Sequence, residues 1–230
     1  MEAYKNEIKE AQNYMEYLKF DKSHPWHRNL IALYLSLIEY SDSLICLVEN
    51  EKSIAIPLIF RGLLEAYVDF KNLAENETYI YYMEANNVKQ ELTLLKEASN
   101  NNNVYLALIA SEPSLLTATI QQYEATLTEL SKKGYKPLKI FEKFEKAGMI
   151  DEFKSIYNDL CSHSHNNINS FTGKFVDIDE AQNDFEITHF KEQADGEIER
   201  HLITGCSYLR NASHKIHAVL ETGYENKFPV

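Results

Sequence analysis

The sequence has little glycine, proline and cysteine, with seven, five and three residues respectively among 230. Glycine and proline supply most tight turns, so their scarcity argues against a sandwich of short strands and favours long helices. The cysteines, Cys46, Cys161 and Cys206, are widely spaced and form no C-x-x-C pair. This spacing argues against a disulfide framework or a cysteine zinc site and predicts a reducing, cytoplasmic location.

Positive charge is also scarce. The chain has 23 lysines and arginines against 35 aspartates and glutamates, which gives a net charge of −12. A field of this sign repels nucleic acid, so we expect no DNA binding, and RNA binding only through a local basic spot or a partner. The basic cluster formed by Lys139, Lys143 and Lys146 is diluted by glutamates and is typical of a solvated face.

The sequence has no run of 18 uncharged apolar residues, because Arg61 and Glu65 interrupt the most apolar stretch. We therefore expect no membrane-spanning segment. Residues 1–20 are amphipathic and charged and do not resemble a signal peptide.

The chain does contain a series of amphipathic segments with the apolar spacing of helices. These segments cover about 2–19, 28–49, 53–75, 77–99, 115–132, 137–147, 149–163 and 197–222. Alternating residues in 173–190 instead predict a small β-hairpin or an extended arm. We predict one all-α domain, 1–230, built as an up-and-down bundle of about seven or eight helices. In it, 28–49 and 53–75 form a central antiparallel hairpin, and about 100–135 is a mobile excursion.

The segment 53–75 is apolar on nearly every side but carries Arg61, Glu65 and Asp69 at steps of four residues. In a helix these three charges form one stripe, because four residues bring side chains back to nearly the same face. A charge inside a bundle must be paired and hydrogen-bonded. The stripe therefore predicts either a polar cleft that serves a function or an Arg61–Glu65 pair that fixes the register of the helix.

A second segment, 149–171, begins as an apolar helical face and ends in a polar run that contains His163, His165, Asn166 and Asn167. Serine and asparagine favour helix ends, and histidine titrates near neutral pH, so this end offers donors, acceptors and a proton carrier. Two histidines two residues apart could hold a metal together only from extended backbone. We predict no metal and no cofactor.

The last predicted helix, 197–222, carries a second polar line formed by Arg210, His214 and His217. A polar line on a terminal helix is usually a solvated surface. We therefore place this line second to the stripe of 53–75 as a candidate site.

Two stretches carry a resemblance: RGLLEAYVDFKNL and, about ninety residues later, YNDLCSHSHNN. They resemble an uncharacterised bacterial family of helical domains with an R-x-x-x-E helix and a later Y-x-x-L-[CS]-x-x-x-H segment. The similarity covers roughly 28–171. The matching residues are Arg61, Glu65, Tyr157, Leu160, Cys161 and His165.

That layout is similar to the HEPN superfamily of helical bundles. The resemblance implies a dimer and, for many members, a metal-independent ribonuclease in toxin–antitoxin or antiviral defence systems. The HEPN signature is an arginine and a later histidine with four to six residues between them. The segment around His165 has no arginine at that spacing, whereas Arg210 and His217 fit it with a polar residue after the arginine.

Two functions stay open. In a ribonuclease or toxin-type effector, His165 would move a proton, Arg61 would hold a phosphate and Glu65 would orient either group. In a non-catalytic binding module, the same cleft would hold a protein or small ligand. Either function predicts that Arg61 or Glu65 lies within direct or one-water hydrogen-bond reach of His165. The further binding candidates are Asp69, Tyr157, His163, Asn166 and Asn167.

We also expect a two-fold homodimer, the commonest soluble oligomer. The tyrosine-rich stretch 79–83 and the apolar side of the last helix offer more amphipathic surface than one bundle needs.

Overall fold

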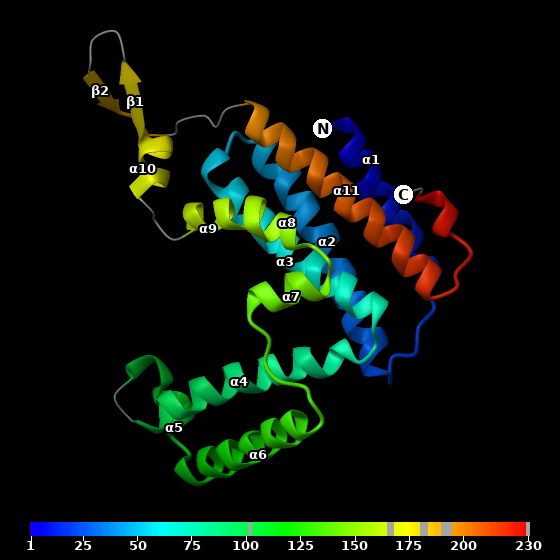
Figure 1. Ribbon diagram of the computed structural model, residues 1–230, viewed down its shortest axis with the longest axis vertical. Helices are drawn as coiled ribbons and strands as arrows, with labels where there is room; N and C mark the ends of the chain where they lie inside the picture. The colour runs from blue at the N-terminus through cyan, green and yellow to red at the C-terminus, as the bar shows by residue number, and fades with distance from the viewer. Residues whose placement is uncertain (101–102, 165–167, 180–183, 190–194, 229–230) are drawn as a thin grey trace. The chain divides into compact units, whose positions relative to one another are not determined.

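The computed structural model describes the chain except residues 101–102, 165–167, 180–183, 190–194 and 229–230 (Figure 1). The prediction of an all-α fold with one small β-hairpin is confirmed. The chain, which the sequence analysis treated as one domain, forms two compact units. The first unit comprises 1–75 and 143–230, and the second comprises 76–142.

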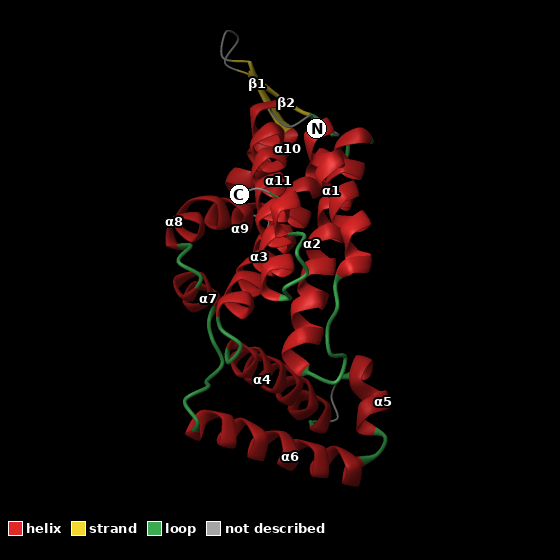
Figure 2. Ribbon diagram, turned by 90° about the vertical axis from the view of Figure 1, so that its right-hand side faces the viewer, coloured by secondary structure: helices red, strands yellow, loops and turns green. Residues whose placement is uncertain are grey.

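The centre of the first unit is a hairpin of two long helices, α2 (Pro25–Glu49) and α3 (Ile56–Glu75). Helix α11 (Asp195–Val219) packs against both of them, and α1 (Glu2–Tyr14) packs against α11 and α2 (Figure 2). The largest side chains with almost no exposed surface come from α1, α2 and α3, from the segment 140–146 and from the C-terminal segment: Tyr4, Tyr34, Phe60, Phe70, Phe144 and Phe228.

Helix α2 begins at Pro25, three residues earlier than the predicted start at 28. Proline suits the first helical position because its missing N–H would have no partner there and its fixed φ is already helical. His24 takes the extended conformation that a residue before proline prefers, with φ −81° and ψ 117°.

By length and composition, α2 could also cross a membrane, and among the described residues it is the one helix that passes this test. The sequence analysis expected no such helix. The finding is weak evidence for a membrane span, because the core helix of a soluble protein passes the same test. In this fold Leu30, Tyr34 and Leu37 of α2 have no exposed surface, and α3 and α11 pack against the helix.

Two buried hydroxyl contacts join α2 to its neighbours. Tyr4 Oη donates to Ser41 Oγ at 2.7 Å, which links α1 to α2. Tyr34 Oη lies 2.8 Å from Ser213 Oγ, which links α2 to α11. Burial raises the pKa of both tyrosines, so they stay protonated.

Helices α1 and α11 approach closely at Gly205. A Cβ atom at this position would lie 2.6 Å from Tyr4 Oη, nearer than side-chain atoms can come. We expect Gly205→Ala to lower the free energy of unfolding by about 1–3 kcal/mol, because the buried Tyr4 ring must move.

A urea titration measures this effect, with Gly196→Ala as the matched control in the same helix. A Cβ atom at Gly196 would meet nothing within 4 Å. Gly196→Ala should therefore leave stability unchanged or raise it by up to about 1 kcal/mol through helix propensity. Equal effects of the two substitutions would contradict the close packing at Gly205.

The segment 150–164 is one run of helical backbone, as the sequence predicts, but it contains a π-helical turn. It comprises α8 (Ile150–Glu152), the π-helix Phe153–Tyr157 and α9 (Asn158–Ser164). The preceding helix α7 (Ile140–Lys146) contributes Phe144, whose ring centroid lies 5.4 Å from that of Phe153 and 5.0 Å from that of Tyr157.

The predicted hairpin within 173–190 is present but short. Strand β1 (Val176–Asp179) pairs antiparallel with β2 (Asp184–Ile187), so that Val176 lies opposite Ile187. Helix α10 (Ile168–Phe175), which the sequence analysis did not predict, precedes it. Four short 3₁₀ turns complete the regular structure of the described chain: Met15–Tyr17, Ser53–Ala55, Val104–Leu106 and Glu225–Lys227.

The second unit is built on α4 (Tyr79–Ser99) and α6 (Pro113–Lys132), which pack together, with the short α5 (Ala107–Ala110) between them in sequence. Lys96 Nζ lies 2.6 Å from Glu124 Oε1. The ring centroid of Tyr135 lies 4.8 Å from that of Tyr81 and 5.1 Å from that of Tyr82. Most of the stretch expected as an excursion is therefore a helix packed on α4.

Candidate functional site

The charged stripe of α3 meets the π-helical turn through Tyr157. Arg61 Nε donates to Glu65 Oε1 at 2.9 Å, and Tyr157 Oη donates to the same oxygen at 2.8 Å. Arg61 Nη2 in turn donates to Tyr157 Oη at 3.1 Å, and its Cζ lies 5.2 Å from the tyrosine ring centroid. The three side chains form a closed triangle, which we call the Arg61 network.

Tyr157 is fixed as a proton donor in this network. Its ring is buried, and burial followed by the hydrogen bond to Glu65 raises the pKa of the phenol far above its usual value. Tyr157 is positioned by a π-helical turn. The backbone hydrogen bonds of such a turn join residues five apart instead of four, which rotates the side chains that follow relative to their directions in an α-helix. Such turns often occur at functional sites, although here the turn serves an internal contact.

The third charge of the stripe has a separate partner. Lys143 Nζ donates to Asp69 Oδ2 at 2.8 Å, and both side chains are mostly buried. The basic cluster that the sequence assigned to a solvated face thus supplies one ion-pair partner. Asn72 Nδ2 also donates to the backbone oxygen of Lys143 at 2.9 Å, which holds α7 against α3.

Two histidines lie beyond the Arg61 network, on α9 and α11. His201 is 8% exposed, its ring lies 4.6 Å from that of Phe60, and its Nδ1 has no hydrogen-bond partner among the described residues. Burial, together with the charges of Arg200 and His163, lowers the pKa of His201 to about 4, so the ring is neutral at pH 7. His163 Nδ1 is likewise buried without a partner in the described chain, and the His163 carbonyl accepts from Lys174 Nζ at 2.8 Å.

Three of the predicted site residues, His165, Asn166 and Asn167, lie outside the described residues. The predicted contact between Arg61 or Glu65 and His165 therefore stays a prediction. What the structure brings together is Arg61, Glu65 and Tyr157, residues that the sequence placed in two segments about ninety positions apart.

The three polar side chains of α11, Arg210, His214 and His217, each have a different partner. Arg210 Nε donates to Glu7 Oε2 at 2.9 Å, and His214 Nδ1 lies 3.0 Å from the Glu225 backbone oxygen. His217 has no exposed surface; its Nδ1 lies 2.7 Å from Thr222 Oγ1, and its ring stacks on Phe228 at 5.5 Å. In this structure Arg210 and His217 thus have separate surroundings, and His217 is covered by the C-terminal segment.

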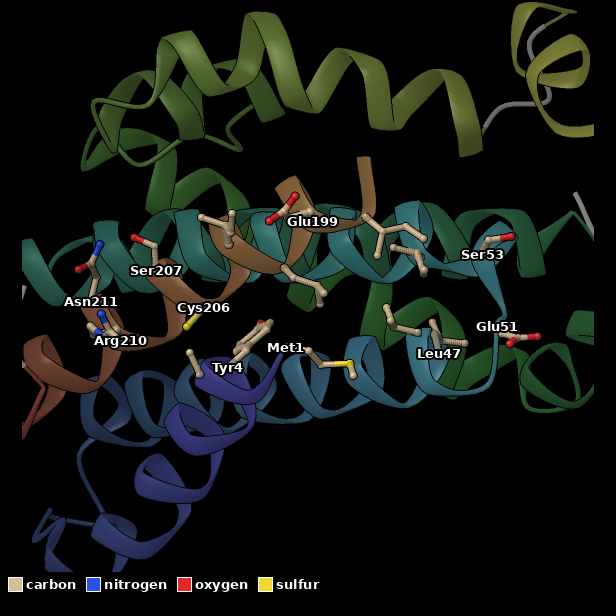
Figure 3. A pocket seen from close by; sticks show the side chains of 16 residues that line it. Met1, Tyr4, Leu47, Glu51, Ser53, Glu199, Cys206, Ser207, Arg210 and Asn211 are labelled. Carbon is tan, nitrogen blue, oxygen red and sulfur yellow. The ribbon is translucent and has the colours of Figure 1, made fainter. Parts of the chain in front are cut away.

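Sequence reasoning did not find a surface pocket of the first unit. A pocket of about 740 Å³ follows the first half of α11 and is bordered by the start of α1 and by the turn between α2 and α3 (Figure 3). We call it the α11 groove. It is lined by Met1, Ala3, Tyr4, Leu47, Val48, Glu51, Ser53, Ile56, Ile198, Glu199, Leu202, Ile203, Cys206, Ser207, Arg210 and Asn211.

The walls of the α11 groove are mostly aliphatic, and several apolar side chains at its rim are open to solvent. Ile203 is 63% exposed and Met1 52% exposed. Burial raises the pKa of the Cys206 thiol, so this cysteine is held in its less reactive form. A sequence signal for the groove existed only in part: the apolar side of the last helix was noted as a surplus amphipathic surface.

Fold and site together define an all-α protein with an internal Arg–Glu–Tyr network and an apolar surface groove. A model described as a family of unknown function, DUF5677, matches residues 27–184, and the chain belongs to this family. The match contains the whole Arg61 network but not the parts of the groove formed by α1 and α11. No curated protein and no solved structure matches the chain significantly.

Proposed function

We propose that this protein is a non-catalytic helical binding module and that the α11 groove is its binding site for a small apolar ligand. The observation that carries the proposal is the groove itself, because its volume of about 740 Å³ lies in the range of ligand pockets and its walls are largely apolar. This location differs from the Arg61 cleft that the sequence suggested.

The Arg61 network supports the same choice. Glu65 Oε1 already accepts two hydrogen bonds, from Arg61 and from Tyr157, and Tyr157 is held protonated. His201 is neutral, and its pKa of about 4 makes it a poor base at pH 7. Arg61, Glu65 and Tyr157 satisfy one another, as expected for an ion network that fixes the packing of α3 against the π-helical turn.

The groove is tested with N-phenyl-1-naphthylamine, a neutral apolar dye whose fluorescence rises in an apolar site. We expect saturable binding with one site per chain. Ile203→Asp should weaken it at least about tenfold, because a carboxylate at the wall must lose water to admit the dye.

Ile187→Asp is the matched control, since Ile187 is an 80% exposed isoleucine on the hairpin, outside the groove. This variant should bind the dye as the original protein does. Equal loss of binding in the two variants, or no saturable binding in the original protein, would overturn the proposed site.

A HEPN-like, metal-independent ribonuclease is the second candidate function. It is favoured by the way the two resembling segments meet in one network within the family match. Cleavage of single-stranded RNA in the presence of a chelator, lost in Arg61→Ala but kept in Arg28→Ala, would support it over the binding module. Arg28 is an exposed arginine whose side-chain donors, within the described part of the chain, bond to backbone oxygens of the preceding loop, at Lys22 and Ser23.

A further inference from the structure

We infer that the α11 groove takes a linear organic cation: a hydrocarbon chain that ends in an ammonium group. This inference rests on the proposed function and adds the chemical class of the ligand. It follows from the shape of the groove and from the charges that line it.

The groove is long and narrow. Its α11 wall runs from Ile198 to Asn211, which at 1.5 Å per residue is about 20 Å. A volume of about 740 Å³ over that length gives a mean cross-section of about 40 Å². A single extended hydrocarbon chain fits this width.

The unpaired side-chain charges that line the groove are negative. The carboxylates of Glu51, at the turn between α2 and α3, and of Glu199, on α11, form no ion pair or hydrogen bond with any described residue. Figure 3 shows Glu51 and Ser53 at one end of the groove and Arg210, Asn211 and Ser207 at the other. The positive charge of the Met1 amino group, close to Cys206, lies between these two ends of the groove.

The Arg210 end does not offer a free cation to an acid. Arg210 is paired with Glu7, and the charge of Glu10 acts on it as well. Glu7 is 5% exposed, and its second oxygen, Oε1, is buried with no hydrogen-bond partner in the described part of the chain. Within the described chain, the side-chain charges left unpaired in the groove lining are therefore those of Glu51 and Glu199, and the net charge of −12 attracts cations from solution.

Displacement of the neutral dye by three ten-carbon competitors tests the charge preference: decyltrimethylammonium, 1-decanol and decanoate, each below its micelle concentration. We expect the cation to bind about tenfold more tightly than the anion, with the alcohol between them, and we expect the ratio to fall in high salt. Glu51→Gln combined with Glu199→Gln should bring the ratio to about two or less. Glu197→Gln, which removes a neighbouring carboxylate outside the groove lining, should leave it unchanged.

Each outcome separates the inference from the proposed function. Dye binding with equal displacement by cation and anion would overturn the cation and leave the groove as a binding site. No dye binding at all would overturn both. If light scattering shows a dimer that Ile203→Asp converts to the monomer of 26.7 kDa, the groove is an interface between two copies, and the small-cation inference is wrong.

Discussion

Replacing Tyr157 by alanine should cost about 3–5 kcal/mol of unfolding free energy, among the largest effects expected for one substitution in this chain. The ring is 4% exposed and packs between Phe144 and Phe153, with ring centroids 5.0 and 5.4 Å away. Alanine would leave a cavity among these rings and remove a hydrogen-bond partner from both Arg61 and Glu65.

Tyr157→Phe is the matched control, because it keeps the ring and removes only the hydroxyl. Arg61 and Glu65 still pair with each other, so we expect a loss of about 1 kcal/mol. Guanidinium unfolding curves measure both variants. Should phenylalanine cost as much as alanine, the hydroxyl network rather than ring packing would hold α3 against the π-helical turn.

Acidification should destabilise the protein through two buried histidines, His201 and His217. Burial lowers the pKa of His201 to about 4 and lowers that of His217 as well. Below the ordinary histidine pKa of about 6.5 the unfolded chain binds protons that these folded rings do not, so the unfolding free energy falls as pH falls. For His201 the loss between pH 6.5 and 4 amounts to about 3 kcal/mol, at roughly 1.4 kcal/mol per pH unit.

The measurement is the unfolding free energy from pH 8 down to about pH 4, compared between the original protein and His201→Leu. Many carboxylates also titrate in this range, so the difference between the two curves isolates the histidine. We expect that difference to shift steadily in favour of leucine as pH falls below about 6.5. Parallel curves would show that His201 has the same pKa in the folded and unfolded states, which would contradict this prediction.

Protonation of His217 should have a second, local effect. His217 holds the C-terminal segment through Thr222 and Phe228, so its protonation should loosen that segment before the bundle unfolds. Hydrogen exchange at residues 222–228 should therefore speed up on acidification in the original protein.

These expectations assign stability to the Arg61 network and ligand binding to the α11 groove. The family match covers the network but leaves α1 and α11 outside it. The network is therefore a candidate for a feature of the whole family, whereas the groove also depends on α1 and α11, which lie outside the match.

Local pattern was enough to predict the helices and the small hairpin. Apolar residues repeated every three to four positions in 28–49 and 53–75, and helices α2 and α3 occupy nearly those ranges. The alternation in 173–190 likewise predicted the β1–β2 pair. Such patterns are reliable because each depends only on neighbours along the chain.

The sequence also predicted that the stripe of Arg61, Glu65 and Asp69 needs partners, because charge inside a bundle must be paired. It could not predict which ones. Tyr157 and Lys143 reach the stripe from more than seventy residues away, and their approach depends on how α7 and α9 pack and on one π-helical turn. A π-turn changes the direction of every later side chain in the helix without leaving a clear sequence pattern.

Only the tertiary structure decided the α11 groove. It forms where three segments distant in sequence, the start of α1, the α2–α3 turn and the first half of α11, come together without filling the space between them. Hydrophobic periodicity indicates which face of a helix is apolar, but whether a neighbour covers that face depends on the length and position of the neighbour. The charges of the groove also depend on tertiary contacts. Arg210 pairs with Glu7, which is 203 residues away in the sequence. Within the described chain, this pair leaves Glu51 and Glu199 as the unpaired side-chain charges of the groove.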